Sequence, residues 1–210
     1  MSEPGRFITL EGGEGAGKST LIQGLSAEFE RRNIEVVITR EPGGTPLAES
    51  VRSLALMPPD DQSWSALSHA LLMNTARSDH LEKRIRPALA QGKWVLCDRF
   101  ADSTRAYQSV DGVPGETLMA LERAVVGETR PDLTLILDAD PAALAERRRA
   151  RGTDDVFEAK DLGFHQRIRS AFLAIAEAEP HRCKVVDALQ SPAQVLADAL
   201  NAIDQRLALA

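Results

Sequence analysis

A glycine-rich segment near the start of the chain carries a specific chemical pattern. Residues 12–19 read GGEGAGKS, a full match to G-x-x-x-x-G-K-[ST], between an apolar run and a helical pattern. Glycines let such a loop wrap closely around phosphate, so that backbone N–H groups at a helix N-terminus face its oxygens. Lys18 is expected to bridge β- and γ-phosphates, and the Ser19 hydroxyl to bind Mg²⁺. The segment predicts a nucleotide site formed by Gly12, Gly13, Glu14, Gly15, Ala16, Gly17, Lys18, Ser19 and Thr20.

A second candidate is Asp98-Arg99-Phe100, at the end of the apolar run VLCDRF. A carboxylate at the carboxyl end of a parallel strand lies beside the glycine-rich loop if the two strands are neighbours. Asp98 could then hold Mg²⁺ through water, and Arg99 could bind a phosphate. Taken alone, a salt bridge at a strand end would be the better interpretation.

A third candidate is the basic cluster Arg147-Arg148-Arg149-Ala150-Arg151-Gly152. Such charges usually form the solvated face of a helix. Here the cluster ends at a glycine and leads into a polar stretch. That pattern predicts a short mobile lid, at about residues 147–158, that brings arginines onto transferring phosphates.

Short apolar runs alternate with long helical patterns, which is typical of βαβ units around a parallel sheet. The expected strands are Phe7–Glu11, Ile34–Thr39, Trp94–Asp98, Leu133–Asp138 and Lys184–Asp187. The expected helices lie near Lys18–Arg32, Pro46–Met57, Trp64–Gln91, Gly115–Gly127, Pro141–Arg151, Glu158–Glu179 and Ser191–Leu207. Pro87 predicts a kink or break. No linker divides the chain, so we expect one α/β domain over residues 1–210.

Composition narrows the class of protein. The 25 Lys and Arg against 31 Asp and Glu give a net charge of −6, which argues against nonspecific binding to nucleic acid or to anionic membranes. No apolar stretch is long enough to span a bilayer, and no secretory signal is visible. Cys97 and Cys183 cannot form a disulfide framework. A reduced, cytoplasmic protein is expected.

Five segments together resemble the bacterial thymidylate kinases, a nucleoside monophosphate kinase family. They are FITLEGGEGAGKST, TREPGGTPLAESVR, LLMNTARSDH, VLCDRFADSTRAYQ and RPDLTLILD, in matching order from Phe7 to Asp187. The resemblance implies a P-loop NTPase fold, with a five-stranded parallel sheet flanked by helices and a short lid. It implies a homodimer formed by helices away from the nucleotide sites. The implied reaction transfers the γ-phosphate of ATP, with Mg²⁺, to dTMP, giving dTDP and ADP in dTTP synthesis.

The resemblance also implies roles for individual residues on the acceptor side. Glu14 would accept a hydrogen bond from the sugar 3′-hydroxyl of dTMP, and Arg99 would bind the acceptor phosphate. Tyr107 would pack against the sugar and leave no room for a 2′-hydroxyl. Glu41, with Pro42, would lie in the loop next to the acceptor.

Further residues match those around the base. Arg77 corresponds to the arginine that reads the thymine edge, while Ser103 and Thr104 lie where the family contacts the base. Gln108 resembles a neighbouring pocket residue. Without the matched order of segments, Arg77 would be interpreted as surface, Tyr107 as core and Glu41 as a turn cap.

The chain departs from the family pattern at two positions. Family members whose phosphate-binding loop lacks a basic residue, as with Gly15 here, use a lid arginine, but Val156 stands where that arginine is common. The charge must then come from another lid arginine, Arg151 or one of Arg147, Arg148 and Arg149. Met73 stands where the family usually has a phenylalanine stacked on thymine, so its contact with the base is a hypothesis.

Two alternatives remain open from the sequence. The acceptor could be another deoxynucleoside monophosphate. The chain could instead be a P-loop switch that binds GTP, but the patterns N-K-x-D and D-x-x-G, which such switches use, are absent from the sequence.

Overall fold

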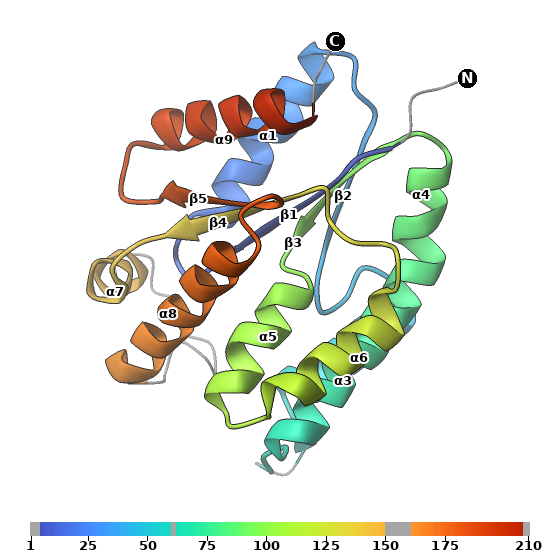
Figure 1. The fold of residues 1–210 in the computed structure, drawn as a ribbon, viewed down its shortest axis with the longest axis vertical. Helices are drawn as coiled ribbons and strands as arrows, with labels where there is room; N and C mark the ends of the chain where they lie inside the picture. Colours follow the sequence, from blue (N-terminus) through green and yellow to red (C-terminus); the bar gives the residue numbers. More distant parts are fainter. Residues whose placement is uncertain (1–4, 60–61, 150–160, 208–210) are drawn as a thin grey trace.

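Five parallel strands form the centre of the molecule, in the order β2-β3-β1-β4-β5 (Figure 1). The computed structural model describes residues 5–59, 62–149 and 161–207. The strands are β1 (Phe7–Gly12), β2 (Val36–Arg40), β3 (Trp94–Asp98), β4 (Leu133–Asp138) and β5 (Cys183–Asp187). The expectation of a five-stranded parallel sheet flanked by helices is therefore confirmed.

Helices cover both faces of this sheet. Figure 1 shows α1 (Lys18–Arg31) and α9 (Pro192–Leu207) on one face, with α5 (Ala101–Val110) and α8 (Leu162–Ala178) on the other. The remaining α-helices of the described chain are α2 (Pro46–Leu56), α3 (Ala66–His80), α4 (Arg86–Ala90), α6 (Gly115–Val126) and α7 (Pro141–Arg149). Among the described residues, no helix combines the length and the apolar character that crossing a membrane requires.

The central strands are apolar without alternation because both of their faces are covered. Every residue of β1 is buried, and so are the first four of β3 and the first five of β4. One core cluster fills the α1–α9 side around Leu25, Phe29 and Ile203. Two further clusters fill the opposite side, around Phe7 and Phe172. Both faces of the sheet are thus packed against helices.

Several element boundaries differ from the predictions. The strand expected from Ile34 begins at Val36, and the last strand begins at Cys183. The helix expected from Trp64 to Gln91 is α3, a π-helical turn at Leu81–Ile85 and then α4. This π turn lies just before Pro87, where the sequence predicted a kink or break, and it takes the form of an i→i+5 turn in a continuing helix. Helix α5 was not predicted at all.

The carboxyl ends of three adjacent strands meet at one edge of the sheet. Leu10 of β1 pairs with Asp98 of β3, and Arg40 of β2 pairs with Asp98 from the other side. The loops that follow these strands therefore emerge together. Ligands bind at this edge in open parallel sheets, so the candidate residues of the sequence meet where the fold favours a site. The predicted lid lies mostly outside the described residues, since residues 150–160 are not described.

Candidate active site

The glycine-rich loop joins β1 to α1 and closes on the side chain of Lys18. The Lys18 Nζ donates to the carbonyl oxygens of Gly12 (3.2 Å) and Gly13 (3.1 Å). Gly12 has φ 128°, and a Cβ there would strike the Leu137 carbonyl oxygen. Gly17 precedes α1 with φ 95°, in the left-handed region that glycine tolerates. Burial, together with the charge of a nearby arginine, lowers the pKa of the Lys18 ammonium.

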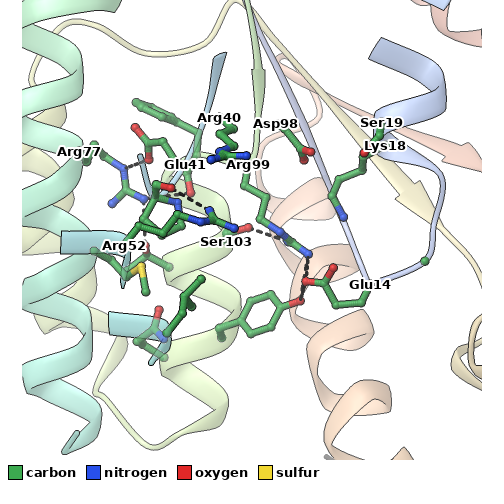
Figure 2. A pocket seen from close by; sticks show the side chains of 18 of the residues that line it. Glu14, Lys18, Ser19, Arg40, Glu41, Arg52, Arg77, Asp98, Arg99 and Ser103 are labelled. Atoms are coloured by element: carbon green, nitrogen blue, oxygen red, sulfur yellow. Dashed lines mark hydrogen bonds and ion pairs between the residues drawn. The ribbon is translucent and has the colours of Figure 1, made fainter. Parts of the chain in front are cut away.

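Asp98 carries an oxygen atom that suits a hydrated cation. Its Oδ1 is buried and has no hydrogen-bond partner among the described residues. In Figure 2 the Asp98 carboxylate faces the side of the cavity where Lys18 and Ser19 lie. The described residues contain no cluster of three or more metal-binding side chains. Mg²⁺ commonly keeps several waters and uses one or two protein oxygens with substrate phosphates, so Asp98 and Ser19 fit this ion.

Arg99 connects the glycine-rich loop to helix α5. Its guanidinium pairs with the Glu14 carboxylate and donates to the hydroxyls of Ser103 (3.0 Å) and Tyr107 (3.3 Å) (Figure 2). Arg99 has φ 65°, a left-handed conformation that is uncommon for a residue with a side chain. Burial raises the pKa of Glu14, but the charges of Arg99 and Lys18 outweigh it and bring that pKa to about 2. The Glu14–Arg99 pair is therefore fully ionised at neutral pH.

Glu11, the residue before the glycine-rich loop, is a buried carboxylate that sequence reasoning did not single out. It accepts hydrogen bonds from the backbone N–H groups of Phe100 (2.8 Å) and Ser103 (3.2 Å), and from the Ser103 hydroxyl (2.6 Å). Burial and the charge of Asp102 raise its pKa to about 7, against the opposing charge of Arg99. The sequence gives only a charged residue at the end of an apolar run.

Arg77 is held in a buried polar network with Glu41. Both side chains are 3% exposed, and the Arg77 Nε donates to the Glu41 carboxylate at 2.8 Å. The other Glu41 oxygen lies 3.0 Å from Nδ1 of His80, which is fully buried. Arg77 also donates to the Phe100 carbonyl oxygen (3.1 Å) and to the Thr104 hydroxyl (3.0 Å). The arginine thus connects α3 to the loop after β2 and to α5.

One cavity of about 330 Å³ is lined by nearly every candidate residue. The sequence-predicted residues on its wall are Glu14, Gly15, Gly17, Lys18, Ser19, Thr20, Glu41, Met73, Arg77, Asp98, Arg99, Ser103, Thr104, Tyr107 and Gln108. Gly12, Gly13 and Ala16 belong to the loop behind this wall. Its length runs from the Lys18 end to Arg77, so a phosphate-bearing ligand and a second ring-bearing ligand could meet within it.

Comparison with known proteins gives a consistent result. The family model described as thymidylate kinase matches residues 10–199. The thymidylate kinase of Caulobacter vibrioides is 49% identical over 206 residues, covering 98% of this chain and 99% of the relative. That of Pseudomonas syringae pv. tomato is 50% identical over 194 residues, covering 92% of each. The crystal structure of thymidylate kinase from Ehrlichia chaffeensis has a TM-score of 0.75 and 36% identity, covering 95% of this chain and 99% of that one.

The chain belongs to the thymidylate kinase family. Membership makes it a nucleoside monophosphate kinase with the P-loop NTPase fold, as the resemblance implied. The interpretation as a nucleotide switch is not favoured. Val156, where this thymidylate kinase family member departs from the pattern, and Arg151, one of the arginines that could replace the missing charge, lie outside the described residues. Arg147, Arg148 and Arg149 close the described part of α7, and nothing is described of their side chains.

Three further residues of this thymidylate kinase family member line the cavity without having been predicted: Arg40, Arg52 and Leu56. Arg52 and Leu56 stand four residues apart on α2, so they share one helix face. The Arg52 Nη1 donates to the Pro42 carbonyl oxygen at 2.8 Å. Burial and the charge of Arg40 lower the pKa of Arg52. This spacing was visible in the segment TREPGGTPLAESVR, but only the fold shows that the face points into the site.

Proposed function

We propose that this chain transfers the γ-phosphoryl group of ATP to the phosphate of dTMP, giving dTDP and ADP in dTTP synthesis. One observation carries the proposal: Lys18 and Ser19 share a single cavity with Arg99 and Arg77. A phosphate donor at the first pair and a nucleoside monophosphate at the second pair would then have adjoining phosphates. Membership of the thymidylate kinase family supports thymine as the base of the acceptor.

The donor phosphates would lie in the glycine-rich loop, with Lys18 on the β- and γ-phosphates. Ser19 and Asp98 would hold Mg²⁺, and this assignment is supported by the Asp98 Oδ1, which is buried without a hydrogen-bond partner in the described part of the chain. When bound, the ion would neutralise charge on the phosphate oxygens. The remaining loop residues, Gly12, Gly13, Gly15, Ala16, Gly17 and Thr20, would surround the phosphates.

Arg99 would bind the acceptor phosphate, since its guanidinium is buried beside the glycine-rich loop and can form paired N–H···O bonds. Glu14 would accept the sugar 3′-hydroxyl. The Tyr107 ring, fixed between Phe164 and Phe172 at centroid distances of 6.3 Å, would fill the space beside the sugar and exclude a 2′-hydroxyl. Arg52 supplies a further positive charge at this end of the cavity.

The thymine base would lie between the remaining wall residues. Arg77 would donate to the base edge, and its fixed position in the Glu41 network supports such a role because a preorganised donor loses less freedom on binding. Met73 would lie over the ring. Thr104, Ser103 and Gln108 would complete the pocket.

These groups act by positioning and by charge. The attacking oxygen already belongs to a phosphate anion, so the transfer needs no strong general base. Lys18 and Arg99, with a lid arginine such as Arg151, would surround the charge spread over the transferring phosphoryl group. Closure of the lid would exclude water and so suppress hydrolysis of ATP.

A coupled assay of ADP release, with ATP–Mg²⁺ and a panel of dTMP, dUMP, dCMP and dGMP, tests the proposal. dTMP should give the highest kcat/KM, and preference over dUMP should be about four-fold, since one buried methyl group is worth roughly 0.8 kcal/mol. Lys18→Ala should lower kcat by orders of magnitude while the protein stays folded. Higher kcat/KM with another acceptor, or full activity of Lys18→Ala, would overturn the assignment.

We also propose a homodimer, as the resemblance implies, but through α2 and α3, which pack against each other and also line the cavity with other side chains. The exposed apolar residues here are 39–71% exposed: Leu47 and Leu54 on α2, Met57 directly after α2, and Leu67 and Leu71 on α3. Exposed apolar side chains gathered on two neighbouring helices are typical of an association surface. The two buried, unbridged cysteines support the expected reducing, cytoplasmic location.

Sedimentation of Leu71→Lys against wild type tests the dimer. Leu189→Lys is a matched control, because Leu189 is 45% exposed but follows β5, away from α2 and α3. Leu71→Lys should sediment as a monomer and Leu189→Lys as a dimer. A monomeric wild type, or a dimeric Leu71→Lys, would contradict this interface.

A further inference from the structure

The two N–H groups of the turn that carries Arg99, those of Arg99 and Phe100, are both held by the end of β1. The Arg99 N–H donates to the Leu10 carbonyl oxygen at 2.9 Å, and the next N–H, of Phe100, donates to the Glu11 carboxylate at 2.8 Å. A residue in the left-handed region persists only where its surroundings fix it. Two consecutive residues of β1 supply that constraint, one through its backbone and one through its side chain.

Glu11 also reaches the Arg99 side chain, through one intermediate. Its Oε2 accepts the Ser103 hydroxyl at 2.6 Å, and the same Ser103 oxygen accepts from Nη1 of Arg99 at 3.0 Å. All three groups around the Glu11 carboxylate are donors, so its ionised form matches them. The carboxylate therefore orients the serine lone pair toward the guanidinium.

The position of Glu11 in the chain gives this contact a consequence. The residue directly after it, Gly12, accepts a hydrogen bond from Lys18. Glu11 and Gly12, at the end of β1, thus contact both positively charged groups: Lys18, assigned to the donor phosphates, and the turn of Arg99, assigned to the acceptor phosphate. We propose that Glu11 is a positioning residue, which holds Arg99 at a set place relative to the phosphate-binding loop. This inference rests on the proposed function, because it takes Arg99 as the acceptor-phosphate ligand.

Glu11→Gln is the informative substitution because it keeps size and shape. Its amide nitrogen would face either the Ser103 oxygen, to which it can only donate, or the two backbone N–H groups, from which it cannot accept. The serine hydroxyl then loses its acceptor, and the hydrogen bond from Arg99 competes with one from the amide. A misplacement of about 1 Å can lower a rate roughly 100-fold, so kcat/KM for dTMP should fall by about 10- to 100-fold. KM for ATP should stay within about two-fold, since the contacts of Lys18 are unchanged.

Asp102→Asn is the matched control. Asp102 is buried one residue into α5, as close to the turn as Ser103, but its carboxylate pairs with Arg182 on the far side of the helix. Asp102 acts on Glu11 only through its charge, and removing that charge favours the ionised Glu11 that its donors fit, so Asp102→Asn should lower the melting temperature and leave KM for dTMP unchanged. Ser103→Ala removes the intermediate, together with the contact that Ser103 is proposed to make with the base, and it keeps the proposal testable if Glu11→Gln does not fold.

Steady-state kinetics of wild type, Glu11→Gln, Ser103→Ala, the double variant and Asp102→Asn, with a thermal melt of each, form the experiment. The proposal expects a rise in KM for dTMP in the Glu11 and Ser103 variants, smaller in the double variant than the product of the single effects. Equal changes in KM for ATP and dTMP, or the same dTMP effect in Asp102→Asn, would overturn it. An inactive wild type would instead overturn the proposed function.

Discussion

Replacing Arg77 by methionine should separate its place in the fold from its place in the site. The guanidinium makes four hydrogen bonds among the described residues, to Glu41, Asn74, the Phe100 carbonyl and Thr104, and it stacks 5.3 Å from the Phe100 ring centre. Methionine fills similar space but satisfies none of these partners. The Glu41 carboxylate would stay buried with His80 as its remaining described partner.

The magnitude follows from the burial of both charges. Breaking a buried pair by removing one partner costs about 3–5 kcal/mol, because the other charge is left uncompensated. For a chain of this length, one kcal/mol corresponds to roughly 2–4 °C in melting temperature, so Arg77→Met should lower it by about 6–20 °C. Glu41→Gln in the same protein removes the stranded charge, and the double variant should recover about 1 kcal/mol or more.

Thermal melts at matched protein concentration, with and without ligand, measure both effects. Saturation at 100 times Kd adds about 2.7 kcal/mol by mass action, so dTMP should raise the melting temperature of wild type by roughly 5–11 °C. Arg77→Met should lose that rise and keep the one produced by ATP–Mg²⁺. A loss of stability under about 1 kcal/mol would refute the buried-charge argument. An unchanged response to dTMP would refute the role of Arg77 at the base.

Substitutions at three further residues of the candidate site give additional tests. Tyr107→Ala should raise relative activity with the ribonucleotide while Tyr107→Phe keeps the discrimination, because the ring excludes the 2′-hydroxyl; equal selectivity in rate assays of both variants would contradict this role. Met73→Phe should tighten dTMP binding up to several-fold if Met73 lies over thymine, since aromatic pairs add about 0.5–1.5 kcal/mol. A dTMP titration that finds no change, with stability lowered by about 1–3 kcal/mol, would make Met73 a core residue. Because the pKa of Glu14 falls from 4.5 to about 2 on folding, its ionisation adds stability above pH 4.5 that is lost as pH falls toward 2. Urea unfolding should therefore find Glu14→Gln less stable than wild type at pH 6 and the gap smaller at pH 3, and a gap that widens in acid would disprove the assignment.

The sheet could be predicted from sequence because its strands are buried on both faces. Continuous apolar runs such as VLCD and LTLILD are typical of strands buried on both faces of a parallel sheet. Helix α5 escaped prediction for the opposite reason. Its buried positions include Asp102, Thr104 and Gln108. In the sequence alone these residues resemble a polar loop, because their partners lie elsewhere in the chain.

The residues of the candidate site also differ in how far the sequence alone could indicate them. Lys18 and Ser19 could be found because their loop has a fixed local spacing, and Asp98 and Arg99 because they end an apolar run. Glu11 could not, because its partners lie about 90 residues away. Its role depends on β1 and β3 being neighbours, which the local sequence does not state.

The ion pair between Arg99 and Glu14 bears on how quickly ligands leave. If Arg99 binds the acceptor phosphate as proposed, that phosphate competes with the Glu14 carboxylate that already pairs with the guanidinium. The gain on binding is then only the difference between two pairings. When the product departs, Glu14 can take the guanidinium back, which lowers the barrier to dissociation. A site arranged in this way holds its acceptor less tightly and releases it sooner, which favours rapid turnover wherever release is slower than chemistry.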